Sequence, residues 1–270
     1  MLPLFLLRAA VSMGLLSMIA GTAGLYTEMR GLSFLVAASA HAALGGAALG
    51  VFLSLRGVPL PPEVFALLFS VLVAVLAGLV GGRALEAARM ETAVGVAFAL
   101  SMCSASLFLY YIPPAMQPLV WSYIVGDPLL VTGRELLMLS STTSATVILF
   151  AVFRREFTYV CFDPEGAAAH GLRTRLYNTV MLVLVAASVS LACKVVGAIL
   201  MYVVMIMPAA ASSRLSRSLS SMTLLTAFSA LSFQLLGLAS SALLDAPAAA
   251  VAGVLCSVFY ALSLKFGRSG

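Results

Sequence analysis

The chain has 270 residues, of which 62% are hydrophobic and only 9% are charged, with a formal net charge of +5. A soluble domain carries about 25% charged residues, so this composition excludes a soluble globular protein and indicates a polytopic membrane protein. One spanning helix needs about 20 apolar residues, which leaves room for eight to ten spans and for little else. We therefore expect an all-α fold in which residues 1–270 form a single transmembrane domain that binds no nucleic acid.

Nine apolar stretches are predicted to cross the bilayer. The first contains Arg8, and an uncleaved helix is favoured there over a signal peptide because many further spans follow. The seventh is short, and a bend is expected at Gly197. The stretches are 5–25, 34–55, 64–82, 92–111, 136–153, 176–193, 195–211, 222–243 and 247–266.

Basic residues predict the orientation, because cytoplasmic loops of membrane proteins carry an excess of Lys and Arg. If the segment at 154–175 is cytoplasmic, eleven basic residues lie on that side: Arg30, Arg83, Arg89, Arg154, Arg155, Arg173, Arg175, Arg214, Arg217, Lys265 and Arg268. The other side keeps Arg8, Arg56, Arg134 and Lys194. The C-terminus is therefore expected in the cytoplasm and, with nine spans, the N-terminus outside.

The second span carries a stripe of small residues at every fourth position, which ends in the Gly-x-x-x-Gly pair Gly46 and Gly50. Such a stripe lets a neighbouring helix backbone approach closely, so these glycines are predicted to pack helices together. His41 lies beside the stripe. It is either a packing histidine with one hydrogen bond or a functional residue, because ionisable groups inside a membrane are costly.

Four prolines between Tyr110 and Glu135 forbid a continuous helix in that segment, and Trp121 and Tyr123 suit a membrane–water interface. A short surface helix is expected around Pro118–Val125. It is either an interfacial anchor or part of a docking surface for an outside partner.

The longest predicted cytoplasmic segment contains Asp163, Pro164 and Glu165, a pattern typical of a helix start, and Gly171, a helix stop. One short helix from Pro164 to His170 is therefore predicted.

Pro208 interrupts the seventh span before a second predicted cytoplasmic segment at 209–221. Proline removes a backbone donor and crowds the preceding turn, so a change of direction is expected there. Ser212 and Ser213 would then cap a short new helix that carries Arg214 and Arg217. The alternative is an ordinary membrane helix with a basic anchor.

Asp245 follows the eighth span and precedes Pro247. It lies either at the outer interface, with little effect, or along a polar path through the protein. The sequence has no Gly-x-x-x-x-Gly-Lys-Ser/Thr loop for ATP and no His-Glu-x-x-His motif. The chain itself is therefore not expected to be an enzyme.

Three stretches, LSFLVAASAHAALGGAALG (32–50), DPEGAAAHGL (163–172) and VVGAILMYVVMIMPAAASSRL (195–215), resemble the membrane permeases of zinc, manganese and iron(II) ABC importers. Asp245-Ala246-Pro247 and the Gly126-Asp127 pair fit the same pattern. The similarity covers nearly the whole chain in order.

This resemblance implies the fold of the larger helical importers and a homodimer in the cell membrane of a prokaryote. A separate ATP-binding subunit and an extracytoplasmic metal-binding protein would be its partners. The segment after Pro208, with Arg214 and Arg217, would be the coupling helix that contacts the ATPase, and Asp163 and Glu165 would lie beside it. His41 and Asp245 would line the path of a divalent metal ion, which is a transported substrate and not a permanently bound cofactor.

Two departures from the family pattern affect this expectation. The family usually has an aspartate four residues before the histidine, where this chain has Ala37, and Leu-Pro-Gly where it has Leu44-Gly45-Gly46. A His and Asp pair is a small ligand set for Zn²⁺ or Mn²⁺. An ABC permease for a metal chelate or vitamin-sized compound is therefore one alternative. An ion-coupled secondary transporter is another, although the sequence shows no internal repeat.

Overall fold

The computed structural model describes residues 4–80, 87–126 and 128–266, and every regular element within these ranges is a helix. Nine segments in the described part are long and apolar enough to cross a membrane, which confirms the predicted all-α polytopic fold. The first span joins α1 (Leu4–Ile19), the π-helix η1 (Ala20–Gly24) and α2 (Leu25–Met29). The others are α3 (Ser33–Ser54), α4 (Pro62–Val80), α5 (Ala87–Tyr111), α7 (Gly133–Val152), α10 (Thr174–Val196), α11 (Ala198–Leu215), α12 (Leu219–Leu244) and α13 (Ala248–Phe266).

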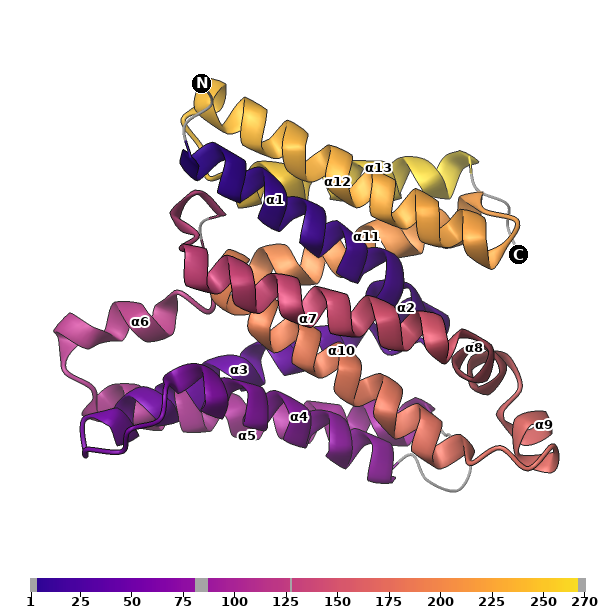
Figure 1. Cartoon of the computed structure of the whole chain (residues 1–270), viewed down its shortest axis with the longest axis horizontal. Coiled ribbons are helices and arrows are strands. Elements are labelled where there is room, and N and C mark those ends of the chain that lie inside the picture. The colour runs from indigo at the N-terminus through magenta and orange to yellow at the C-terminus, as the bar shows by residue number, and fades with distance from the viewer. Residues whose placement is uncertain (1–3, 81–86, 127, 267–270) are drawn as a thin grey trace.

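The spans form two groups of three helices with a layer between them (Figure 1). Helices α3, α4 and α5 pack together in one group, and α11, α12 and α13 pack together in the other. Helices α1, α7 and α10 connect the groups. The N-terminal end of the described chain and α6 (Gln117–Trp121) lie at one end of the bundle. Helices α8 (Arg154–Phe162) and α9 (Pro164–Ala169) and the C-terminal end lie at the other (Figure 1).

Helix α3 is the most enclosed span because its small residues allow two neighbours to approach its backbone. A Cβ atom on Gly46 would overlap the Phe65 carbonyl of α4, and one on Gly50 would lie 2.7 Å from the Cα atom of Pro62. On another side of α3, a Cβ atom on Gly45 would lie 2.6 Å from the Ser101 carbonyl oxygen of α5. The glycines therefore let α4 and α5 contact α3 at backbone distance.

The expected bend at Gly197 is the break between α10 and α11. Gly197 has φ +81° and ψ 157°, a conformation that residues with a Cβ rarely adopt. Its backbone lies against that of Gly126, and the Ala198 N–H donates to the Tyr123 carbonyl oxygen over 2.8 Å. The loop after α6 is thus held in the gap between the two spans.

The predicted end of the helix at Pro208, with a new helix after it, is wrong. Helix α11 continues past Pro208 to Leu215, and Ser212 and Ser213 lie inside it, so they cap no new helix. Proline removes the donor for the Val204 carbonyl and crowds the preceding turn, but the helix continues because it is packed among buried neighbours on both sides of this position. The N-cap serine is Ser218, whose side chain accepts a hydrogen bond from the Ser221 N–H at the start of α12.

Of the two predicted short helices, one agrees with its prediction and the other ends earlier. Helix α9 spans Pro164–Ala169 with His170 as its C-cap, which agrees with the predicted Pro164–His170 helix. Helix α6 follows the 3-10 turn η2 (Pro114–Met116) and ends at Trp121, earlier than expected. A further 3-10 turn, η3 (Pro128–Leu130), precedes α7. Asp127, Arg83 and Arg268 lie outside the described residues.

Candidate functional site

His41 lies on the face of α3 that contacts α5. Its ring is half-buried and lies edge-on to Phe98, with 4.9 Å between the ring centroids. The ring Nδ1 is 2.8 Å from the Ala37 carbonyl oxygen, one turn earlier on the same helix. Because a carbonyl oxygen only accepts hydrogen bonds, Nδ1 is the donor in this bond, and the tautomer that fits it has its lone pair on Nε2. A metal-binding histidine is oriented in this way, with one ring nitrogen bonded to the protein and the other open.

Asp245 is the C-cap of α12. Its backbone is left-handed, with φ 49° and ψ 41°, and its side chain is exposed. The sharp turn between α12 and α13 therefore presents this carboxylate to the solvent at the end of the bundle where the N-terminus lies (Figure 1).

The structure does not bring His41 and Asp245 together in one chain. His41 belongs to the α3–α4–α5 group and Asp245 to the α11–α12–α13 group (Figure 1). Within the described ranges, no cluster of three or more His, Cys, Asp and Glu residues could hold a metal ion. A single protomer thus offers one nitrogen and one carboxylate at separate places.

The residues predicted to contact an ATPase lie at the opposite end of the molecule. Arg214 is in the last turn of α11 and Arg217 is in the turn to α12, and both side chains are exposed. Asp163 caps α9 by accepting the Gly166 N–H at 2.8 Å, and Glu165 is exposed in the first turn of that helix. Figure 1 shows α9 projecting from the bundle beyond α8, so α9 is the most prominent structured element of this end.

The turn after α6 forms a cluster that the sequence did not indicate. Tyr123 is fully buried, and the Lys194 ammonium of α10 lies 5.3 Å from its ring centroid. Burial raises the pKa of Tyr123 above its ordinary value, so the phenol is neutral. The cluster fixes this turn between α10 and α11 through side-chain as well as backbone contacts.

At the other end, Arg30 and Cys161 are close and both partly buried. Burial raises the pKa of the Cys161 thiol to about 12, although the positive charge of Arg30 opposes this shift. Burial also lowers the pKa of Arg30. The thiol, which lies 3.8 Å from the Met181 sulfur, is therefore protonated at neutral pH.

A model of the ABC 3 transport family matches residues 4–267. The chain belongs to this family. It is 26% identical over 264 residues to the manganese transport system membrane protein MntC of Listeria innocua, covering 97% of this chain and 90% of that protein. It is 27% identical over 267 residues to a probable iron transport system membrane protein of Haemophilus influenzae, covering 98% and 94%.

A solved structure, PsaBC of Streptococcus pneumoniae in complex with Fab, superposes with a TM-score of 0.82 at 23% identity, over 97% of this chain and 92% of that one. At this identity the likeness shows the fold. Family membership and fold together identify the protein as a multi-pass membrane protein of the ABC transporter type, similar to metal transport permeases.

Proposed function

We propose that this chain is the permease subunit of an ATP-driven importer for a divalent metal ion in a prokaryotic cell membrane. The match to the ABC 3 family over residues 4–267, on a chain that lacks an ATP-binding loop, carries this proposal. The proposed assembly is a homodimer with a separate ATP-binding subunit and an extracytoplasmic metal-binding protein. Alternating access would arise when the ATPase moves the helices of the two groups relative to each other.

His41 is the proposed metal contact within the membrane, because the Ala37 carbonyl holds its ring at Nδ1 and thereby leaves Nε2 as the nitrogen that could bind an ion. Asp245 is proposed at the outer mouth of the path, since it is exposed at the end opposite α9 (Figure 1). With no metal cluster among the described residues, the remaining ligands would be water or groups of a second copy. Weak coordination, shared between protein groups and water, suits a transported ion because the ion must dissociate from the site again.

The proposed docking surface for the ATP-binding subunit comprises α9 and the turn between α11 and α12. Helix α9 is capped at both ends, by Asp163 and by Gly171 with φ +82°, so it is a rigid projection despite its length. The exposed Glu165 and the exposed Arg214 and Arg217 give this surface charges of both signs. The basic residues around it place it, and the C-terminus, on the cytoplasmic side in this proposal.

Co-purification with the ATP-binding subunit tests the docking surface. Reversing the charges with Arg214→Glu and Arg217→Glu, or with Glu165→Lys, should abolish or strongly reduce co-purification. The control is Arg134→Glu, an exposed arginine at the opposite end of the bundle, which should leave assembly unchanged. Assembly of the variants at the wild-type level would refute the docking surface.

Uptake of Mn²⁺, Fe²⁺ and Zn²⁺ into proteoliposomes tests the function. The complete complex with its binding protein and ATP should accumulate one of these ions, and His41→Ala and Asp245→Ala should each lower that uptake. Wild-type uptake in both variants would refute the site. Stimulation of ATP hydrolysis by a metal chelate but by no free ion would favour a chelate permease, which Ala37 in place of an aspartate also favours. Accumulation without nucleotide would indicate a secondary transporter.

A further inference from the structure

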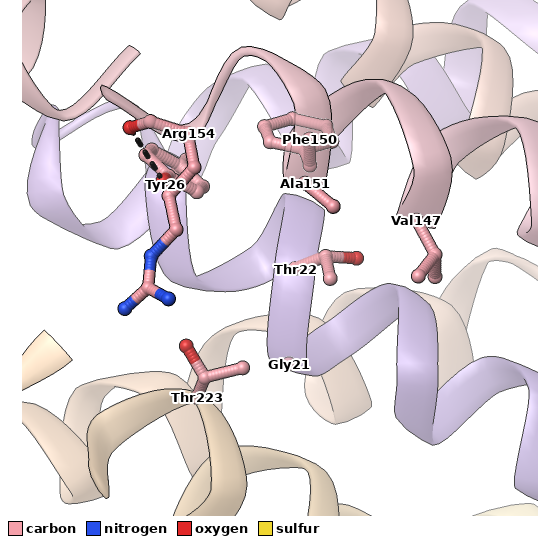
Figure 2. A pocket seen from close by; sticks show the side chains of 8 residues that line it. All are labelled: Gly21, Thr22, Tyr26, Val147, Phe150, Ala151, Arg154 and Thr223. Atoms are coloured by element: carbon pink, nitrogen blue, oxygen red, sulfur yellow. Dashed lines mark hydrogen bonds between the residues drawn. The ribbon is translucent and has the colours of Figure 1, made fainter. Parts of the chain in front are cut away.

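A crevice runs along the flank of the bundle between α7 and α12. Its inner part has a volume of about 160 Å³, with Val147 and Ala151 of α7 on one side and Thr223 of α12 on the other (Figure 2). Both helices pack against η1, which forms the floor with Gly21 and Thr22. The crevice therefore lies within the membrane-spanning part of the protein, near the end that carries α8.

The inner part of the crevice is apolar even though two threonines line it. The Thr22 hydroxyl donates to the Met18 carbonyl oxygen over 2.8 Å, and the Thr223 hydroxyl donates to the Leu219 carbonyl oxygen over 2.9 Å. Both hydroxyls are thus satisfied within their own helices. The flanking side chains that face outward from the protein are apolar and exposed: Ile148 and Val152 on α7, and Leu224 and Phe228 on α12.

The outer part of the crevice is wider and basic. It has a volume of about 540 Å³ and is lined by Arg154, Arg155, Thr158, Tyr159, Phe162 and Leu219. The first five of these lie on one face of α8, because they are spaced by one helical turn or are adjacent to such a position. This face of a short helix thus presents two exposed guanidinium groups beside the membrane, whereas the Thr158 and Tyr159 hydroxyls already form hydrogen bonds with Tyr26 and His170.

Arg154 lines both parts and connects the two walls. Its Nη2 donates to the Ser220 hydroxyl of α12 over 2.8 Å, across the mouth of the crevice. Its backbone carbonyl accepts a hydrogen bond of 3.4 Å from the Tyr26 hydroxyl of α2 (Figure 2). A guanidinium group has five N–H donors, so the bond to Ser220 occupies one of them.

We propose that this crevice binds an anionic phospholipid from the leaflet on the α8 side, with its phosphate against Arg154 and Arg155 and an acyl chain between α7 and α12. The order of the surfaces carries the proposal: two exposed arginines at the membrane surface are followed by an apolar slot that opens sideways among exposed apolar residues. A phospholipid has its parts in the same order, with an anionic headgroup followed by apolar acyl chains. Basic pockets beside spanning helices bind anionic headgroups for the same electrostatic reason. By the orientation proposed above, this is the cytoplasmic leaflet.

The crevice suits a lipid better than it suits the ATP-binding subunit. The arginine-lined groove adjoins the slot between the spanning helices, with Arg154 lining both, and a soluble subunit has no access to that slot, whereas α9 projects away from the bundle (Figure 1). A soluble phosphate compound would satisfy the arginines but would leave the slot empty.

Native mass spectrometry of the purified chain with phosphatidylglycerol and phosphatidylcholine of matched acyl chains tests the proposal. Phosphatidylglycerol should bind preferentially. The variant Arg154→Gln/Arg155→Gln should weaken its binding by about 30-fold, since one arginine near a membrane surface contributes about fivefold. Ala151→Phe fills the slot and leaves both arginines in place, and it should also weaken binding. The matched controls are Arg173→Gln, on the same end but outside the groove, and Ala145→Phe, exposed on α7 but outside the slot.

Equal binding of both lipids, or unchanged phosphatidylglycerol binding in the double arginine variant, would overturn the proposal. Competition by glycerol phosphate as strong as that by the lipid would show a phosphate site without a lipid. Loss of ATP-binding subunit from the double arginine variant, with phosphatidylglycerol binding unchanged, would assign the groove to that subunit. The single variant Arg155→Gln provides a second test that leaves the bond between Arg154 and Ser220 in place. It should lower phosphatidylglycerol affinity about fivefold.

Discussion

The substitution Gly46→Ala tests whether backbone contact between α3 and α4 holds the first helix group together. An ideal Cβ atom at residue 46 would overlap the carbonyl oxygen of Phe65 and lie within 2.8 Å of the Ala66 Cα atom. Both atoms belong to the backbone of α4, so no side-chain rotation relieves the overlap, and the two helices must separate. Overpacking of this kind destabilises a protein by about 1–3 kcal/mol.

A chain of this size loses about 2–4 °C of melting temperature per kcal/mol, so Gly46→Ala should lower the Tm by about 2 to 12 °C. Thermal unfolding in detergent, followed by circular dichroism or intrinsic fluorescence, measures the change. The matched control is Gly14→Ala in α1, where a Cβ atom would have no neighbour within 4 Å. It should leave the Tm unchanged or raise it slightly, because alanine favours a helix. An equal Tm for both variants and the wild type would show that α3 and α4 are not held by backbone contact.

The other predictions concern three local features. Gly197→Ala should destabilise the chain by about 1–3 kcal/mol, because φ is +81° and the Gly126 backbone is adjacent, and the same Tm measurement checks it. Pro208→Ala should keep or raise the Tm, since it returns an N–H to the Val204 carbonyl of a helix that is continuous there; a lower Tm would contradict this. With Cys161 as the sole cysteine, maleimide labelling at pH 7–8.5 should be slow until SDS unfolds the chain. Its pKa is about 12 when folded and about 8.5 when unfolded, so stability is lost as the pH rises between these values.

The number and order of the spans could be predicted from sequence because each depends on a long apolar run, and bilayer thickness sets the length of such a run. Helix α9 was predictable for a local reason, since Asp163, Pro164 and Gly171 each act within one turn of the helix end. Such features can be predicted without knowing which helices pack against the segment in the folded protein.

Pro208 shows where local reasoning fails. Proline does remove one backbone hydrogen-bond donor, but whether the helix breaks there depends on the residues that pack around the helix. The residues from Pro208 to Ser212 are buried among other helices, which keep the chain helical. The Tyr123 and Lys194 cluster was missed for a related reason, because its members are distant in sequence and are brought together by the break at Gly197.

The candidate metal site was predictable only as separate residues. Ala37 supplies no carboxylate ligand, yet its backbone carbonyl is the group that holds the His41 ring at Nδ1. Residue 37 thus orients the histidine through its backbone, but as an alanine it adds no negative charge to the proposed metal path. One imidazole nitrogen binds a divalent ion more weakly than a nitrogen and a carboxylate together. If the ion passes His41, this chain is suited to rapid release of the ion rather than to its retention, and selectivity among metals would then depend on other parts of the assembly.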